Sequence, residues 1–279
     1  DLKDKKLYRR LEIFPGFLSW ATLIVLLFFS WLKPVWVAYF IIAFDVYWLL
    51  LVIYLGIHLF AAYVSMKKNL KIDWRAKCAN LPWQDLIHLV IFPTHNESLE
   101  VIRPSFAALI RGGYPTEKMI VVLAIEERAG EPAEAKARVI EREFGGKFKH
   151  FLITAHPDNI VGEIKGKGAN QAWAAKTVKR EIIDKFGYGY DKILVSVFDM
   201  DTVVIPGYFY SLTYKFLTVP NPYRASFQPI PVYHNNIWDV PAFARVMETG
   251  SSFFQLIEAT NPEKFVTFSS HSMSFKALV

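Results

Sequence analysis

Two long apolar runs near the start of the chain limit what it can fold into. Between Glu12 and Lys33 no residue is charged, and a second run, residues 35–64, is interrupted only by Asp45 and His58. The 20 residues of the first run, at about 1.5 Å each, span roughly 30 Å, the thickness of the hydrocarbon core of a bilayer. Trp and Tyr residues cluster near the ends of both runs, as at membrane interfaces. The sequence therefore predicts a membrane segment, 13–66.

This segment is expected to form a hairpin of two transmembrane helices, at about 13–32 and 36–64, joined near Lys33 and Pro34. Basic residues flank both runs, and cytosolic flanks are typically rich in Lys and Arg. We therefore expect a multi-pass protein of the cell membrane (inner or plasma membrane) with a basic cytosolic N-terminus, 1–12, and a cytosolic globular domain. The flanking residues are Lys3, Lys5, Lys6, Arg9 and Arg10 before the first run and Lys67, Lys68, Lys71, Arg75 and Lys77 after the second.

The amino-acid composition excludes several classes of protein. The hydrophobic fraction is 53% with glycine excluded, whereas soluble domains reach roughly 45–50% with glycine included, so a disordered chain is excluded. The net charge of +6 is accounted for by the membrane flanks, and we expect a lipid bilayer rather than a nucleic acid as partner. A single cysteine, Cys78, excludes a disulfide framework and a cysteine-based zinc site.

After a predicted linker, 67–85, strand-length apolar runs alternate with helical stretches. This β-α alternation predicts an α/β domain over 86–279, with a mainly parallel sheet covered by helices. The four expected pairs are Ile87–Phe92 with Leu99–Ile110, Met119–Ile125 with Ala133–Phe144, Phe151–Thr154 with Ala169–Phe186, and Ile193–Phe198 with Tyr208–Leu217. Beyond Pro220 we expect an extended segment, Asn221–Asn236, a helix, Ala242–Ala259, and a last strand, Phe265–Phe275.

Polar residues follow each of these strands or precede the next helix. They are the segments Pro93–Ser98, Glu126–Arg128, Glu163–Asn170 and Asp199–Thr202. Ligands of open α/β sheets bind outside the carboxyl ends of the strands, so these segments predict a binding edge.

Two of these segments suggest particular chemistry. Lys167 lies in a Gly-Lys-Gly loop that opens a helix, where backbone N–H groups and the helix dipole suit an anion. Asp199 and Asp201 form an Asp-x-Asp pair directly after a buried strand, and paired carboxylates bind Mg²⁺ or Mn²⁺ together with substrate phosphates. The alternatives are a flexible basic loop and a solvated turn.

The ordered motifs resemble family 2 glycosyltransferases with the GT-A fold. The resemblance rests on Pro-Thr-His-Asn-Glu at 93–97, Gly-Lys-Gly-Ala-Asn at 166–170 and Phe-Asp-Met-Asp-Thr at 198–202. The preceding hairpin resembles the membrane branch that includes cellulose and hyaluronan synthases. Phe227-Gln228-Pro229 and the segment 268–273 are similar to the later motifs that line the acceptor path.

The resemblance implies a hexosyltransferase that uses Mg²⁺ or Mn²⁺ and a nucleotide-sugar donor, with a UDP-sugar as the first expectation. The sugar would be transferred with inversion to a carbohydrate or lipid-linked acceptor. Such a reaction belongs to polysaccharide or glycolipid synthesis. Glu126 stands where the family usually has an Asp that reads the base, which leaves the base open. The implied nucleotide-sugar contacts are Pro93, Thr94, His95, Glu97, Glu126, Lys167 and Asp199, the implied metal ligands are Asp201 and Asp199, and the implied acceptor-path residues are Gln228, Ser270 and His271.

The family's general base belongs to an acidic-pair motif that would follow residue 273, and this sequence has no such motif before Val279. We therefore assign no catalytic residue and expect the base beyond Val279, in a C-terminal part that this chain lacks. Two other hypotheses stay open: a non-catalytic membrane protein that binds nucleotide sugar, and a nucleotidyltransferase. The latter predicts a glycine-rich loop after the first strand, and Pro93–Ser98 contains no glycine.

Overall fold

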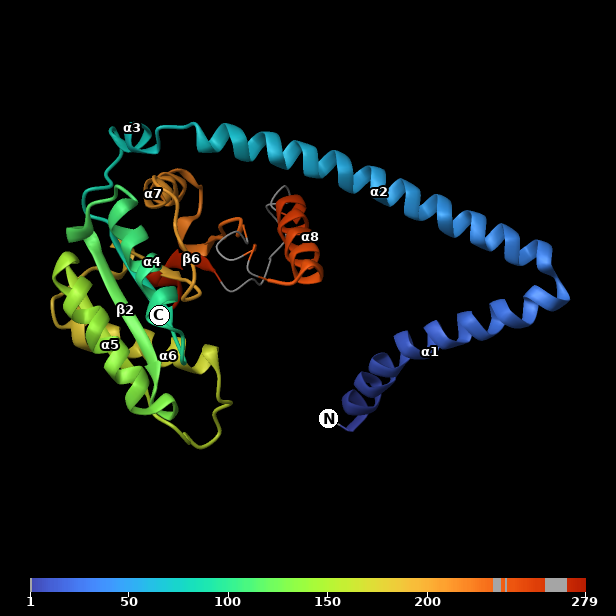
Figure 1. Cartoon of the computed structure of the whole chain (residues 1–279), viewed down its shortest axis with the longest axis horizontal. Coiled ribbons are helices and arrows are strands. Elements are labelled where there is room, and N and C mark those ends of the chain that lie inside the picture. The colour runs from blue at the N-terminus through green and yellow to red at the C-terminus, as the bar shows by residue number, and fades with distance from the viewer. Residues whose placement is uncertain (1, 233–236, 239, 259–269) are drawn as a thin grey trace. The chain divides into compact units, whose positions relative to one another are not determined.

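The computed structural model describes residues 2–232, 237–238, 240–258 and 270–279 (Figure 1). The chain divides into two compact units, Asp1–Tyr63 and Val64–Val279, which are described separately.

The first unit consists of helix α1, Leu2–Leu32, and most of helix α2, Pro34–Leu70. Lys33 separates the two helices because the residue before a proline is disfavoured in the helical conformation, whereas proline itself suits the first position of a helix. Both helices are long and apolar enough to cross a membrane, over Asp4–Leu32 and Pro34–Leu70. The two expected helices are therefore present, and both extend beyond the predicted bounds of 13–32 and 36–64.

The second unit contains a six-stranded sheet in the order β3-β2-β1-β4-β6-β5. The strands β1, β2, β3 and β4 are parallel, whereas β6 runs antiparallel to both β4 and β5. The expectation of a mainly parallel sheet is confirmed. The strands are β1, Ile87–Pro93; β2, Met119–Glu126; β3, His150–His156; β4, Ile193–Val197; β5, Ser226–Phe227; and β6, His271–Ser274.

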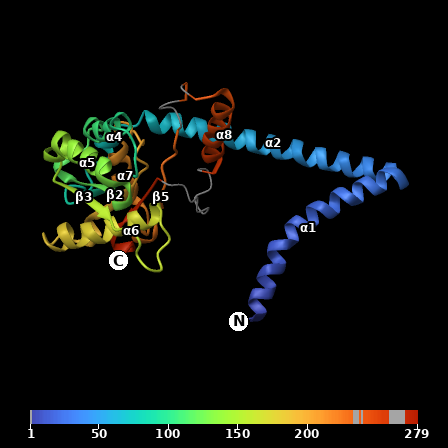
Figure 2. The same cartoon turned by 60° about the horizontal axis from the view of Figure 1, so that its bottom comes forward.

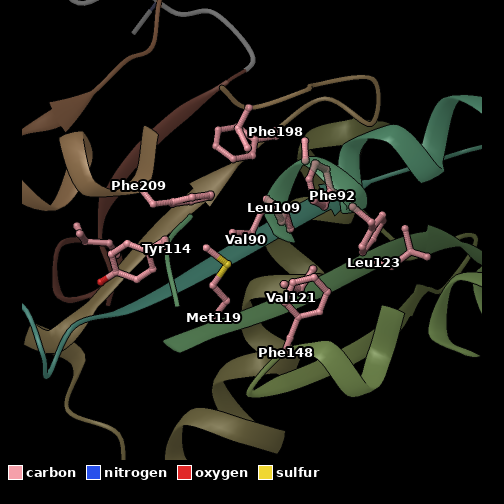
Figure 3. Close-up of a cluster of buried hydrophobic side chains, with 14 of the residues drawn as sticks. Val90, Phe92, Leu109, Tyr114, Met119, Val121, Leu123, Phe148, Phe198 and Phe209 are labelled. Atoms are coloured by element: carbon pink, nitrogen blue, oxygen red, sulfur yellow. The ribbon is translucent and has the colours of Figure 1, made fainter. Parts of the chain in front are cut away.

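Helices cover both faces of this sheet, and Figure 2 shows α4 and α5 on one side and α6 on the other. The two faces follow from the alternation of side chains along a strand: in β1, Val90 and Phe92 belong to one core cluster, and Leu89 and Ile91 belong to the other. Figure 3 shows the first cluster, in which Phe92 lies among other buried aromatic and aliphatic side chains. The helices are α3, Trp74–Cys78; α4, Leu99–Arg111; α5, Gly130–Phe144; α6, Lys167–Val178; α7, Tyr208–Thr218; and α8, Ala242–Glu258.

The interval predicted as a linker, 67–85, contains two helical segments. Its first residues complete α2, and Asp73 begins α3 by accepting a hydrogen bond from the Ala76 amide at 3.0 Å. α3 packs on α7, where the rings of Trp74 and Tyr214 are 5.5 Å apart. The second unit therefore includes the last residues of α2 as well as α3.

The expectations for the last part of the chain are corrected in detail. The segment 221–236 contains a 3₁₀ turn, Pro222–Arg224, and the short strand β5, while its residues 233–236 lie outside the described residues. The last strand is limited to His271–Ser274, and residues 265–269 lie outside the described residues, as does Ala259 at the predicted end of α8. The helix predicted over 169–186 begins at Lys167 and continues from Lys179 to Asp184 as a π-helical turn.

Candidate functional site

The loop after β1 is organised around the carboxylate of Glu97. Its Oε2 accepts hydrogen bonds from the Thr94 hydroxyl and from the backbone amides of His95, at 2.8 Å, and Asn96, at 3.0 Å. Burial raises the pKa of Glu97, but these hydrogen bonds outweigh it and hold the pKa below its ordinary value. The charged carboxylate therefore fixes the conformation of the loop in which the predicted nucleoside contacts Thr94 and His95 lie.

Two neighbouring elements hold this loop in place. Lys136 of α5 donates hydrogen bonds to the carbonyl of Asn96, at 3.1 Å, and to that of Glu97, at 2.8 Å. The Thr94 amide donates to the Ala124 carbonyl of β2 at 2.9 Å, and Pro93 is the buried last residue of β1. The loop is therefore rigid at the carboxyl edge of the sheet.

The predicted diphosphate and metal residues meet at the same edge. The Lys167 ammonium, in the first turn of α6, donates a hydrogen bond to Asp199 Oδ1, which follows β4. Partial burial lowers the pKa of Lys167, while the charges of Asp201 and Glu97 oppose this shift. Lys167 is thus within the electrostatic reach of three carboxylates that come from two different strand ends.

The start of α6 is suited to an anion. Gly166 precedes the helix with φ of 157° and ψ of −177°, a conformation that is essentially restricted to glycine. A glycine has no side chain to bond the first N–H groups of the helix, and these groups have no carbonyl partner within the helix. Their partial positive charge and the Lys167 ammonium therefore lie together.

Asp199 and Asp201 are the carboxylates of the predicted metal site. Among the residues that the structure describes, no three His, Cys, Asp or Glu side chains are grouped so that they could hold a metal ion alone. Mg²⁺ in nucleotide sites is usually held by one or two carboxylates together with waters and substrate phosphates. Asp199 and Asp201 could provide two such carboxylates.

Glu126 lies at the end of β2 and lines a pocket together with Arg128, His156 and Glu163. It is 7% exposed and accepts a hydrogen bond from the guanidinium of Arg128. This bond raises the pKa of Arg128 above its ordinary value. His156, at the end of β3, faces Glu163 across 3.1 Å in the same pocket. The predicted base-reading residue is therefore paired with a cation in a polar pocket.

Lys165 differs from Lys167 in its contacts. Its ammonium donates to Asn159 Oδ1 at 2.8 Å and pairs with Asp158 at 2.5 Å, within the loop between β3 and α6. This pairing, chiefly the hydrogen bond, lowers the pKa of Asp158. The contacts of Lys165 therefore lie within its own loop, whereas Lys167 contacts the acidic pair.

The predicted acceptor-path residues lie on the antiparallel side of the sheet. Gln228 directly follows β5, and His271 begins β6, where it is paired with Val197 at the carboxyl end of β4. Ser270 is buried just before β6, whereas Phe268 and Ser269 of the same motif lie outside the described residues. The carboxyl end of β4 thus separates the acceptor-path residues from the loop after β1.

Sequence reasoning missed several residues that support the site. Lys136 and His156 act through contacts between elements, and no local pattern marked them. Arg128 lies in the predicted segment Glu126–Arg128, but its pairing with Glu126 was not predicted. Asn170 is 1% exposed and donates to the same Ala124 carbonyl as Thr94, at 2.8 Å, so it joins α6 to the β1 loop. Its position in the Gly-Lys-Gly-Ala-Asn motif was a signal that could have identified it.

No protein-family model matches the chain, and no curated protein matches it. Among solved structures, the chain is similar to the mannosyltransferase PcManGT from Pyrobaculum calidifontis, solved in complex with GDP-Man and Mn²⁺. The identity is 15% and the TM-score 0.40, and the alignment covers 80% of this chain and 55% of that one. The chain thus aligns with little more than half of the mannosyltransferase. A superposition this loose carries no inference about substrate or mechanism.

Proposed function

We propose that the chain is the membrane-bound, nucleotide-binding part of a family 2 glycosyltransferase with the GT-A fold. In this proposal α1 and α2 anchor it in the cell membrane, and the second unit binds a nucleotide-diphosphate sugar in the cytosol. The acceptor is a carbohydrate or a lipid-linked sugar, reached through Gln228, Ser270 and His271, and transfer proceeds with inversion.

The observation that carries the proposal is the convergence of Lys167, Asp199 and Asp201 beside the first turn of α6. An ammonium, free helix-terminal N–H groups and two carboxylates meet at the carboxyl edge of a parallel sheet, which is where such folds bind ligands. The cationic groups suit a diphosphate, and the carboxylates suit the cation that accompanies it. The motifs that resemble family 2 enzymes supply these same residues.

The site's own residues support departure of a diphosphate. Lys167 and the N–H groups of α6 stabilise the negative charge that develops on the leaving group, and they do so from fixed positions. Mg²⁺ or Mn²⁺ held by Asp199 and Asp201 would offset more of that charge. Glu97 keeps Thr94 and His95 in place for the nucleoside. Glu126 and Arg128 offer an acceptor and a donor for a base, and we expect uracil first.

Binding of UDP in the presence of Mn²⁺ tests the proposal directly. We expect Asp201→Ala to abolish the Mn²⁺-dependent part of UDP binding in isothermal titration calorimetry, because the cation loses one of its two protein ligands. Asp199→Ala is expected to weaken binding less completely. Asp191→Ala is the matched control, since Asp191 lies at the amino end of β4. Unchanged UDP affinity in Asp201→Ala with Mn²⁺ present would refute the assignment.

A further inference from the structure

Helix α8 turns an apolar stripe outward. With 100° between successive residues, its exposed apolar side chains fall on one side of the helix, with Gly250 at the centre of the stripe. These side chains are Phe243, 75% exposed, Val246, 72%, Met247, 69%, Phe253, 47%, and Phe254, 56%. We call these residues and Gly250 the α8 stripe.

The opposite side of α8 faces the protein, although it is the more polar side. Ser252 and Gln255 are buried there at 8% and 4% exposure, together with Leu256. A surface helix of a soluble domain has the reverse arrangement, with its apolar side inward. An exposed apolar surface of this kind marks an interaction site.

The approach to α8 adds an aromatic residue and a cation. Trp238 is 81% exposed, and the Arg245 guanidinium lies 5.6 Å from the centre of its ring. Trp is enriched at the interface between membrane and water, and Arg keeps its charge at headgroup level while its stem contacts apolar groups. The stripe and its flank therefore combine the residue types of a helix that lies in a membrane surface.

The start of the second unit indicates that a bilayer is within reach. α2 ends at Leu70, and α3 begins at Trp74 and is already packed on α7. Three residues at about 3.5 Å each cover roughly 10 Å at most. If α2 spans the membrane, this short connection therefore tethers the folded unit to the bilayer.

We propose that the α8 stripe inserts into the interfacial layer of the bilayer, with the helix parallel to the membrane surface. The inference rests on the proposed membrane insertion of α1 and α2, and it is independent of donor chemistry. Figure 2 shows α8 on the β5 side of the sheet, away from β3. α8 lies in the chain between Gln228 and Ser270. Its insertion therefore holds the acceptor side of the sheet next to lipid.

The test uses the full chain in vesicles with a fluorescent label on single introduced cysteines. Gly250→Cys places the label within the stripe and removes no apolar side chain, and a Cβ at this position meets no atom within 4 Å. Glu248→Cys is the matched control, because Glu248 is two residues away, lies outside the stripe and is itself exposed. The unaltered chain is the blank, because Cys78 is fully buried.

We expect lipids with a quencher on the acyl chain to reduce the fluorescence at position 250 by about twofold or more, and aqueous iodide to leave it nearly unchanged. The control at 248 is expected to show the opposite. Strong iodide quenching at 250 would overturn the proposal. Protection from both quenchers would also overturn it, since it would indicate a protein contact such as a second copy.

A third label separates this proposal from the one on which it rests. Leu50→Cys lies within the apolar part of α2. Lipid quenching at 50 but not at 250 would refute the role of α8 alone. Absence of lipid quenching at 50 would refute the membrane anchor itself.

Discussion

The ammonium of Lys167 has two possible anionic partners, Asp199 and a bound diphosphate. In the structure it contacts Asp199, and its three donor hydrogens allow it to bond a phosphate oxygen as well. Lys165, two residues earlier, has the same charge but is engaged by Asp158 and Asn159. The pair is therefore an internal comparison between a lysine in the site and a lysine in a loop.

We expect Lys167→Ala to lose about 1.5–3 kcal/mol of affinity for a nucleoside diphosphate, the range for hydrogen bonds to charged groups, and to bind the bare nucleoside as before. Lys165→Ala is expected to stay within about 0.5 kcal/mol of the unaltered chain. Calorimetric titration with UDP and with uridine gives both comparisons. Equal losses for the two lysines would indicate a diffuse basic surface rather than a phosphate contact.

The lowered pKa of Lys167 also predicts the pH dependence of binding. Since its pKa is lower than that of a free lysine, Lys167 loses its proton at a lower pH than other lysines. A bound diphosphate favours the charged form, so affinity for UDP is expected to fall as the pH rises through the pKa of this group. Lys167→Arg keeps the charge at all these pH values and should flatten the alkaline decline. An identical decline in Lys167→Arg would assign it to another group.

Sequence alone predicted which residues gather at the edge but not how they pair. Lys167, at the start of α6, contacts Asp199, which follows β4. The engagement of Glu97 within its own loop, and of Glu126 by Arg128, depends on side-chain conformations and on contacts such as Lys136 to Asn96. These contacts join positions up to 40 residues apart, which no local pattern encodes.

At the scale of elements, the four β-α pairs were predictable because apolar runs of strand length alternate with longer stretches of helical length. The part after residue 220 was less predictable. β5 and β6 are short, and their pairing depends on partners from distant parts of the chain: β6 pairs with β4, and β5, at the edge, pairs with β6. α3 was not predicted, because its five residues are too few to show a helical period of apolar residues.

The first turn of α6 depends on one backbone conformation. Gly166 adopts a φ of 157° that other residues rarely adopt, although the space around it is open. We expect Gly166→Ala to weaken UDP binding without a large loss of stability, because the strain of about 1–3 kcal/mol is relieved by moving the loop rather than the core. Gly168→Ala is the control, since the space around Gly168 is also open and its φ is not in the positive range. Calorimetry and thermal unfolding would separate affinity from stability, and equal UDP affinity in both variants would contradict the role of Gly166.

For the whole molecule, a buried histidine connects stability to pH. His88 of β1 is fully buried, its Nε2 lies 2.9 Å from the Thr213 hydroxyl of α7, and burial lowers its pKa to about 3. The folded state therefore keeps His88 neutral, whereas the unfolded chain binds a proton below about pH 6.5. Stability is thus expected to fall as the pH decreases from about 6.5 toward 3, by at most about 1.4 kcal/mol per pH unit from this group.

Denaturant unfolding of the second unit within the full chain, followed between pH 7 and pH 4, measures this dependence. His88→Gln lacks a titrating group at this position and should show a shallower decline, whereas His95→Gln, at an exposed position, should behave like the unaltered chain. A decline of the same slope in His88→Gln would show that other groups govern acid unfolding.

The proposed orientation predicts which parts of the chain are accessible from outside the cell. A thiol placed at Lys33 should react with a membrane-impermeant reagent in intact cells, and one placed at Lys68 should react only after the membrane is opened. Both positions are exposed; Lys33 directly precedes α2, and Lys68 lies in its last turn. The reverse pattern would place the second unit outside the cell.

The complete burial of Cys78 makes this thiol a natural reporter of folding. Its Sγ donates to the Tyr210 carbonyl at 3.3 Å, and burial raises its pKa, so the reactive thiolate is disfavoured while the second unit is folded. Alkylation of Cys78 then requires opening of the packing between α3 and α7, and its rate measures how often that opening occurs. A mass shift after exposure to an alkylating reagent would therefore follow the integrity of the second unit in detergent or in native membranes, without purification and without a spectroscopic probe.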